Sequence, residues 1–192
     1  MPRILGISGS LRAASYNTGL LRAARDTAGE DVTIDVATLH GIPLYDGDLE
    51  SADGIPQAVA ALKGRIRHAD GVLLITPEYN NSLPGVFKNA IDWTTRPSSD
   101  IPLLYRGRPM AVIGASMGGF GTILSQNAWL PVLRTLGARP FFEGRLLVSR
   151  AQGVFDADGK LVDDKVRAQL ADFIGAFAEF ARTSARKDVR VA

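Results

Sequence analysis

The stretch RILGISGSLRAASYNT at residues 3–18 joins a short apolar run to a polar loop and then to the start of a helical pattern. The run at 3–8 has the composition of a core strand. Four further apolar, partly β-branched runs follow at 32–36, 70–76, 109–115 and 141–148. The run at 70–76 shows no alternation with polar residues, which is typical of a central strand buried on both faces.

Helical patterns separate these runs at 17–28, 55–68, 84–93 and 122–137, and a last one covers 163–183. In the last pattern apolar residues recur at spacings of four and three, so we expect them to pack in the core. They are Val166, Leu170, Phe173, Phe177 and Phe180. Strands alternating with helices predict a parallel sheet covered on both faces. The connection at 37–54 is unusually long, which indicates a functional or disordered segment.

The overall composition limits what the chain can bind. Its 192 residues correspond to one ordinary domain, which we expect to span 1–185, followed by a disordered tail at 186–192. The 22 basic and 20 acidic residues leave a net charge of only +2, which does not favour nucleic-acid binding. Its apolar runs are far shorter than the roughly 18 residues that span a bilayer. We therefore expect a cytoplasmic protein with no nucleic-acid and no membrane partner.

Two residue types that often carry redox or metal chemistry are scarce. The chain has no cysteine, which excludes disulfides, thiolate metal sites, iron–sulfur clusters and thiol nucleophiles. Its only imidazoles are His40 and His68, so a multi-histidine metal centre is impossible and we expect no metal site. Any redox chemistry must therefore reside on a bound organic cofactor.

The loop after the first predicted strand is rich in hydrogen-bonding groups. Hydroxyls stand at Ser10, Ser15 and Thr18, an amide at Asn17 and a guanidinium at Arg12. They precede a helix N-terminus, whose free N–H groups and dipole favour an anion. This combination suits a terminal phosphate monoester. Alternatively, Ser15 or Asn17 only caps the helix, although a cap needs one such residue and the loop has five.

Two more loops follow predicted strands and have distinctive compositions. Residues 76–85 combine prolines, asparagines, a tyrosine and a glutamate, and residues 114–121 are rich in glycine. Because ligands bind beyond the carboxyl ends of parallel strands, we expect all three loops to form one site. The third loop also matches the G-x-S-x-G nucleophile elbow, with Ser116 as the nucleophile. That hydrolase fold needs a histidine after the serine, and none follows Ser116.

Four stretches make the chain similar to a known family. They are GSLRAASYN at 9–17, PLYDGD at 43–48, PEYNNSLPGVFKNAIDW at 77–93 and SMGG at 116–119. With these motifs in this order, the chain resembles the NAD(P)H-dependent FMN reductases, flavodoxin-like proteins that include quinone, chromate and azo-dye reductases. The resemblance implies a flavodoxin-like α/β fold, with a five-stranded parallel sheet in the order 2-1-3-4-5 and helices on both faces. One departure is Phe87, where the common pattern has leucine.

The resemblance also implies which residues bind FMN. Those of the first loop would hold its phosphate: Ser10, Arg12, Ser15, Asn17 and Thr18. Those of the second would border the isoalloxazine and the ribityl chain: Pro77, Glu78, Tyr79 and Asn80. Those of the third would lie beside the ring: Ser116, Gly118 and Gly119. The chemistry requires no side chain as a proton donor, so none is assigned a catalytic role.

The implied activity is that of an FMN-dependent NAD(P)H oxidoreductase. Hydride would pass from NADPH or NADH through FMN N5 to a quinone, free flavin, azo dye or metal oxyanion such as chromate, in a ping-pong mechanism. The resemblance implies a homodimer or homotetramer, with contacts at 43–48 and at the helix that ends in Trp93. The alternatives are a flavodoxin-type electron carrier, which is usually strongly acidic whereas this chain is not, and a non-catalytic flavoprotein.

Overall fold

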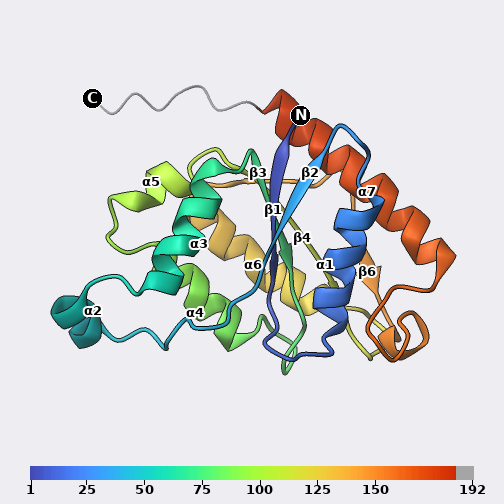
Figure 1. Ribbon diagram of the computed structural model, residues 1–192, viewed down its shortest axis with the longest axis horizontal. Helices are drawn as coiled ribbons and strands as arrows, with labels where there is room; N and C mark the ends of the chain where they lie inside the picture. The colour runs from blue at the N-terminus through green and yellow to red at the C-terminus, as the bar shows by residue number, and fades with distance from the viewer. Residues whose placement is uncertain (185–192) are drawn as a thin grey trace.

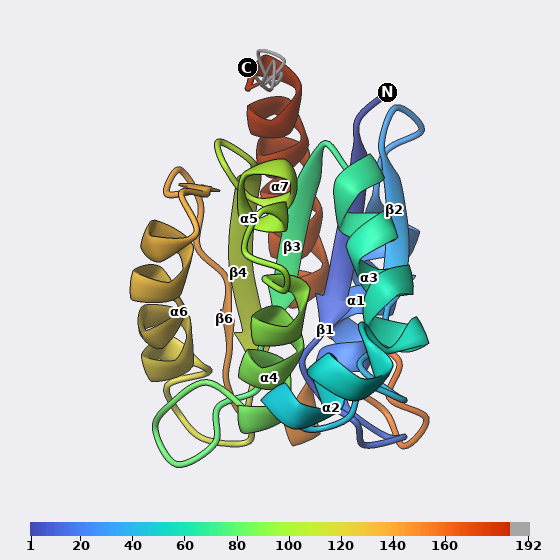
Figure 2. The ribbon, with the colours of Figure 1, turned by 90° about the vertical axis from the view of Figure 1, so that its left-hand side faces the viewer.

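A parallel sheet forms the centre of the computed structural model, which describes residues 1–184 (Figure 1 and Figure 2). Its main strands are β1 (Arg3–Ser8), β2 (Thr33–Ala37), β3 (Gly71–Ile75), β4 (Pro109–Ala115) and β5 (Arg139–Pro140). They lie in the order β2-β1-β3-β4-β5 and pair in parallel. The flavodoxin-like strand order expected from the sequence is therefore confirmed.

Helices cover both faces of this sheet, as predicted. One face carries α1 (Tyr16–Thr27) and α7 (Asp164–Thr183), and the other carries α3 (Gln57–His68), α4 (Gly85–Thr94) and α6 (Ile123–Thr135). Figure 1 shows the sheet nearly edge-on between the two layers. Shorter elements are α2 (Gly47–Asp53), α5 (Asp100–Leu104) and the 3₁₀ turn η1 (Ala151–Gly153).

Alternate side chains of each strand enter two separate cores, because successive residues of a strand point to opposite faces. Leu73 and Ile75 pack with α1 and α7, whereas Val72 and Leu74 pack with the other helical layer. All of β3 is buried, as its unbroken apolar run predicts. The apolar stripe of α7 also lies in the core, since its leucine and three phenylalanines are buried.

The fifth predicted strand, 141–148, is wrong over most of its length. Only Leu147–Val148 (β6) pairs with the sheet, at the end of β4, and β5 lies just before the predicted range. Phe141 still follows the sheet, since its N–H donates to Met110 O of β4 at 2.8 Å. Its ring packs against α7, with its centroid between 5.3 and 5.6 Å from three phenylalanine rings. The Gln126 amide donates to Leu146 O at 3.0 Å, in place of a strand partner.

The 37–54 connection is not a continuous loop, because α2 occupies part of it. Asp46 caps this helix by accepting the N–H of Asp48 at 2.8 Å. No residue of α2 is buried, so the helix lacks the apolar periodicity that would reveal it in the sequence. The tail expected at 186–192 lies outside the described residues. Within residues 1–184, no helix is both long and apolar enough to cross a bilayer.

Candidate functional site

The three loops expected to form a site lie together at the carboxyl edge of the sheet, the lower edge in Figure 1. The strand ends are level, because Ile75 pairs with Ser8 on one side and with Ile113 on the other. Backbone bonds continue this alignment into the loops: Gly9 N–H donates to Ile75 O and Thr76 N–H donates to Ile113 O, both at 2.8 Å. The parallel topology thus brings the loops together, as the sequence predicts.

In the first loop, two of the expected phosphate-binding side chains support the loop itself. Ser15 is the N-cap of α1, and its Oγ accepts the N–H groups of Asn17 at 3.2 Å and Thr18 at 3.4 Å. The hydroxyl of Thr18 is buried, with its Oγ1 2.8 Å from Ser8 Oγ. The capping alternative raised by the sequence therefore describes Ser15.

Ser10 and Arg12 retain donors that the fold does not consume. Ser10 is buried, and its Oγ accepts the Arg12 N–H at 3.3 Å, which leaves the hydroxyl proton for a further acceptor. The exposed Arg12 donates from Nη2 to Ala14 O at 2.7 Å, and its guanidinium lies 5.5 Å from the centre of the Tyr16 ring. No acidic residue stands in the first turn of α1. Hydroxyl donors and positive charge at a helix N-terminus suit a phosphate.

Asn17 extends from this loop to strand β4. Its Oδ1 accepts the Ala115 N–H and its Nδ2 donates to Ala115 O, both at 2.9 Å. Asn17 is buried. Its amide therefore joins the first loop to the residue from which the third loop starts.

The second loop makes a tight turn directly after β3. Backbone bonds of 3.0 Å join Tyr79 and Ser82 in both directions. Asn80 and Asn81 stand between them with φ of 49° and 63°. Positive φ at both central positions is the signature of a type I′ turn, for which asparagine is a preferred residue. The turn leaves Tyr79 about half exposed, while Pro77 at its base is buried.

Glu78 links the second loop to helix α6, a role that the sequence did not reveal. Its Oε2 accepts the N–H groups of Leu124 and Ser125 at 2.8 and 3.0 Å. The N-cap residue of α6, Thr122, makes no side-chain capping bond. Glu78 therefore supplies the cap from outside the helix, and its negative charge stabilises the positive end of the helix dipole.

The third loop is anchored by backbone bonds and carries open glycine backbone. Ser116 N–H donates to Val148 O at 2.9 Å, and Ala151 N–H donates to Ser116 O at 3.0 Å. A side chain added at Gly119 would meet no atom within 4 Å, and one at Gly118 would approach only Ser116 Oγ, at 3.8 Å. The backbone at these two glycines is therefore open, so a ligand can approach it closely.

The hydrolase alternative also fails on geometry. Ser116 Oγ donates to Gly121 O, within its own loop. His40 Nε2 lies 3.1 Å from Leu11 O, and His68, at the end of α3, lies 2.7 Å from Gly64 O at the opposite edge of the sheet. In the part of the chain that the structure describes, no group of three or more His, Cys, Asp or Glu residues could hold a metal ion.

The segment 43–48 is fixed against α4. Tyr45 N–H donates to Asn89 Oδ1 at 2.8 Å, while Asn89 Nδ2 and Trp93 Nε1 both donate to Pro43 O, at 2.8 and 2.9 Å. The Tyr45 ring meets Trp93 edge-on, with centroids 4.9 Å apart. Leu44 stands outside this packing and is 78% exposed.

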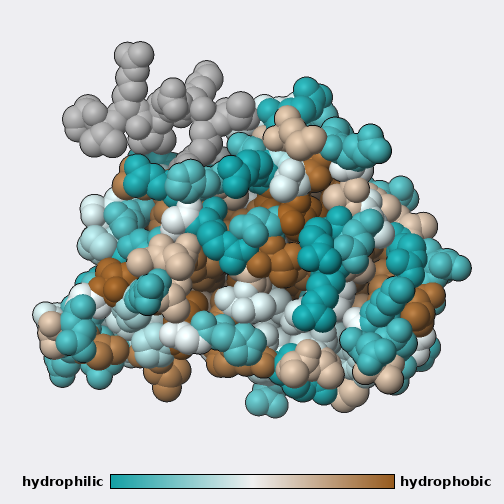
Figure 3. All heavy atoms as spheres, viewed as in Figure 1, coloured by the Kyte–Doolittle hydropathy of each residue, from teal (hydrophilic) through white to brown (hydrophobic). Residues whose placement is uncertain are grey.

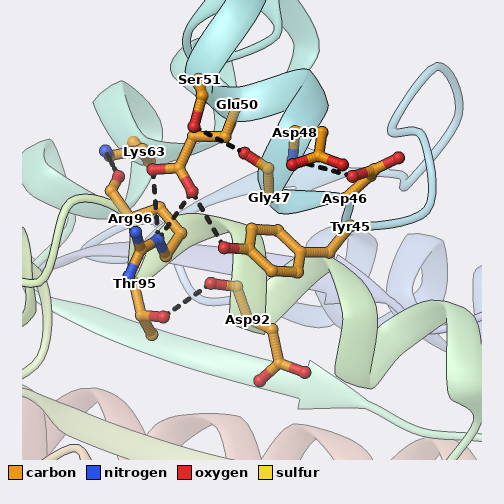
Figure 4. Close-up of polar contacts among 10 residues, drawn as sticks. All are labelled: Tyr45, Asp46, Gly47, Asp48, Glu50, Ser51, Lys63, Asp92, Thr95 and Arg96. Carbon is orange, nitrogen blue, oxygen red and sulfur yellow. Dashed lines mark hydrogen bonds and ion pairs between the residues drawn. The ribbon is translucent and has the colours of Figure 1, made fainter.

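Glu50 of α2 completes the attachment of this segment (Figure 4). It accepts the Tyr45 hydroxyl at 2.9 Å and the Arg96 Nε at 2.8 Å. The hydrogen bond from Arg96 lowers the pKa of the Glu50 carboxyl. Conversely, the bond to Glu50 raises the pKa of Tyr45. The sequence motif included Tyr45 but gave no signal for Glu50, five residues further on, or for Arg96, which is 46 positions from Glu50.

Apolar side chains are exposed around the loop edge. Figure 3 shows hydrophobic surface along the lower margin of the molecule, where the loops lie. In the third loop Met117 is 65% and Phe120 81% exposed. Exposed apolar side chains beside a loop whose donors suit a phosphate are compatible with a ligand that has a charged end and a planar aromatic end.

A parallel doubly wound sheet with such loops at its carboxyl edge defines a flavodoxin-like protein. A family model described as NADPH-dependent FMN reductase matches residues 2–153. The chain belongs to this family.

Named relatives agree with this assignment over nearly the whole chain. An NAD(P)H-dependent FMN reductase of Pseudomonas aeruginosa is 41% identical over 180 residues, which cover 94% of this chain and 95% of the relative. A quinone reductase of Escherichia coli is 35% identical over 183 residues, covering 93% and 94% of the two chains. Among solved structures, the flavoenzyme NAD(P)H:(acceptor) oxidoreductase FerB of Paracoccus denitrificans superposes with a TM-score of 0.85 at 33% identity, covering 97% of this chain and 100% of its own.

Proposed function

We propose that this protein binds FMN across its three loops and uses NADPH or NADH to reduce small electron acceptors, quinones above all. One observation supports the proposal: a helix N-terminus with no acidic residue in its first turn and an open glycine backbone lie at the same edge of the sheet. Bound FMN supplies the redox chemistry, since it accepts a hydride and passes the electron pair on. The protein binds and orients the reactants.

The phosphate end of FMN belongs at the first loop. Ser10 and Arg12 contribute side-chain donors, and the residues Ser15, Asn17 and Thr18 shape the loop and direct N–H groups of the first turn of α1. The absence of acidic residues from that turn favours a dianionic group.

The ring end of FMN belongs between the second and third loops. The segment from Pro77 to Asn80 would border the isoalloxazine and the ribityl chain on one side. Ser116, Gly118 and Gly119 would lie beside the ring on the other, where backbone can approach without a clash from side chains. Backbone N–H groups of this loop would stabilise negative charge that develops on the reduced ring.

Quinones fit the surroundings of this site as acceptors. The side chains of Tyr79, Met117 and Phe120 are exposed on the second and third loops, where a planar acceptor could pack against them. One relative, 35% identical, is a 2-hydroxy-1,4-benzoquinone reductase of Burkholderia. Free flavin, azo dyes and chromate are further acceptors to be assayed.

The oligomeric state is part of the proposal. We expect a homodimer or homotetramer that buries the segment 43–48 and the outer face of α4, because Leu44 is 78% exposed on a segment that is otherwise firmly attached. Sedimentation velocity measures this state directly. The proposed location is the cytoplasm, where NADPH and NADH are available as donors.

The enzymatic proposal is tested by the spectrum of the purified protein. A yellow flavin spectrum that bleaches on anaerobic addition of NADPH or NADH, and returns on addition of a quinone, is the expected result. A flavin that neither nucleotide bleaches would instead favour an electron carrier or a non-catalytic flavoprotein.

The phosphate assignment is tested by Arg12→Ala. A hydrogen bond from a charged donor contributes about 1.5–3 kcal/mol, so FMN affinity should fall by roughly 10- to 150-fold. Riboflavin, which lacks the phosphate, should bind the variant as well as it binds the unaltered protein. Arg25→Ala, in the last turn of the same helix, is the matched control and should leave both affinities unchanged. Unchanged FMN affinity in Arg12→Ala would contradict the assignment.

A further inference from the structure

The side-chain amide of Asn17 pairs with the backbone of a residue that lies 98 positions away in the chain. Oδ1 accepts the N–H of Ala115 and Nδ2 donates to its carbonyl oxygen, both at 2.9 Å. Asn17 lies in the first turn of α1, two residues after the N-cap Ser15, and is 4% exposed. The amide therefore holds the end of β4 in the way that a neighbouring strand would.

These two hydrogen bonds direct the side chain toward β4 and not toward the helix N-terminus. An asparagine amide has two N–H donors and one carbonyl oxygen. The Asn17 amide gives its oxygen and one of these two N–H donors to Ala115. By contrast, the backbone N–H of Asn17 points to Ser15 Oγ, at the helix N-terminus where the phosphate is expected. The side-chain bonds of Asn17 therefore hold the end of β4. Its backbone N–H, by contrast, lies at the end of the helix where the phosphate is expected.

The glycine-rich third loop begins directly after Ala115. Ala115 is the last residue of β4 and immediately precedes Ser116. On its far side the loop is held by the segment after β6, where Arg150 N–H donates to Gly118 O at 3.0 Å. Asn17 is therefore the side chain that connects the phosphate-binding loop to the backbone beside which the ring is expected.

We propose that Asn17 is a positioning residue that sets the alignment of the first and third loops, and that its side chain is not a phosphate ligand. This inference rests on the FMN site proposed above. FMN has a limited span between its phosphate and its ring, so both ends bind well only when the two loops are correctly aligned. Substitution of Asn17 therefore lowers the affinity for both FMN and riboflavin. Substitution of a phosphate ligand lowers only the affinity for FMN, because riboflavin has no phosphate.

The test compares FMN with riboflavin in titrations of the apoprotein, followed by quenching of flavin fluorescence. The variants are Asn17→Ala and the nearly isosteric Asn17→Leu, both of which remove the two bonds to Ala115 without adding a charge beside the expected phosphate. We expect both affinities to fall at least about tenfold and by similar factors, so that their ratio stays within about threefold of its original value. The visible absorption bands of the bound flavin should also shift, because the backbone beside the ring has moved.

Two control variants distinguish a positioning role of Asn17 from that of a phosphate ligand and from a purely structural role. Arg12→Ala should weaken FMN alone and so change the ratio. Thr27→Val removes the hydrogen bond from Thr27 Oγ1 to Ala23 O at the far end of α1, so it should lower the melting temperature without changing either affinity.

The outcomes are distinguishable from one another. A loss confined to FMN in the Asn17 variants would identify the side chain as a phosphate ligand and overturn the inference. A lower melting temperature with both affinities and the flavin spectrum unchanged would reduce Asn17 to a general structural role and also overturn it. If Asn17→Ala does not fold, the nearly isosteric and uncharged Asn17→Leu supplies the measurement. Absence of flavin binding by the unaltered protein would refute the FMN site itself.

Discussion

Replacing Gly114 by alanine should destabilise the protein at the base of the third loop. A Cβ at this position would lie 2.0 Å from Thr76 O and 2.4 Å from Thr122 Oγ1. Neither neighbour can easily give way. Thr76 is buried and its N–H is bonded to Ile113 O in the adjacent strand, while Thr122 is buried and accepts the Gln126 amide at 3.1 Å.

The expected magnitude follows from these contacts. Overpacking a well-packed interior costs typically 1–3 kcal/mol, and a collision with the backbone oxygen of Thr76, the residue that follows the central strand β3, places this change at about 3 kcal/mol. For a protein of this size, each kcal/mol lowers the melting temperature by roughly 2–4 °C. We therefore expect Gly114→Ala to melt about 6–12 °C below the unaltered protein.

Thermal unfolding of the apoprotein, combined with an FMN titration, is the appropriate assay. Gly119→Ala is the matched control, because its Cβ would meet no atom within 4 Å. It should melt at or slightly above the original temperature, since alanine restricts the unfolded chain, but should bind FMN more weakly because the methyl group would occupy the surface next to the ring. A Gly114→Ala protein as stable as the original would refute the steric reasoning. Undiminished FMN binding by Gly119→Ala would refute the position assigned to the ring.

Two carboxylates provide further predictions. Glu78→Gln should lower the free energy of unfolding, measured in urea, by about 1 kcal/mol and should weaken FMN binding. The reason is that the charge that caps α6 is lost while the shape of the side chain is kept. Equal urea midpoints for the variant and the unaltered protein would argue against the cap. Since Arg96 lowers the pKa of Glu50 below its ordinary 4.5, the carboxylate stabilises the fold fully above that value and loses this effect as the pH falls through its folded pKa. Melting temperatures measured from pH 6 to pH 3 should therefore fall less steeply in Glu50→Gln, and parallel curves would contradict the coupling.

Much of the fold could be predicted because its signals are local. The unbroken apolar run of β3 indicates burial on both faces, and the spacing of Leu170, Phe173 and Phe177 indicates which face of α7 is covered. Helix α2 could not be predicted, because none of its residues is buried. The fifth strand was misplaced because Phe141, Leu146 and Val148 are buried as strand residues would be, although only Leu147–Val148 of the predicted range forms a strand. Burial is a local signal, whereas pairing with β4 depends on a distant part of the chain.

The sequence by itself determined the order of strands and helices, the chemistry of the three loops and the family to which the chain belongs, since these depend on local periodicity and contiguous motifs. Only the tertiary structure decided which polar side chains remain available to a ligand. Ser15 caps a helix, Glu78 caps another, and Asn17 is bonded to Ala115, whereas Ser10 and Arg12 retain donors for a phosphate. The physical reason is that a polar side chain near a site forms hydrogen bonds with the groups that the fold places beside it. For Glu78 and Asn17 those groups belong to a distant part of the chain, so the local sequence does not reveal them.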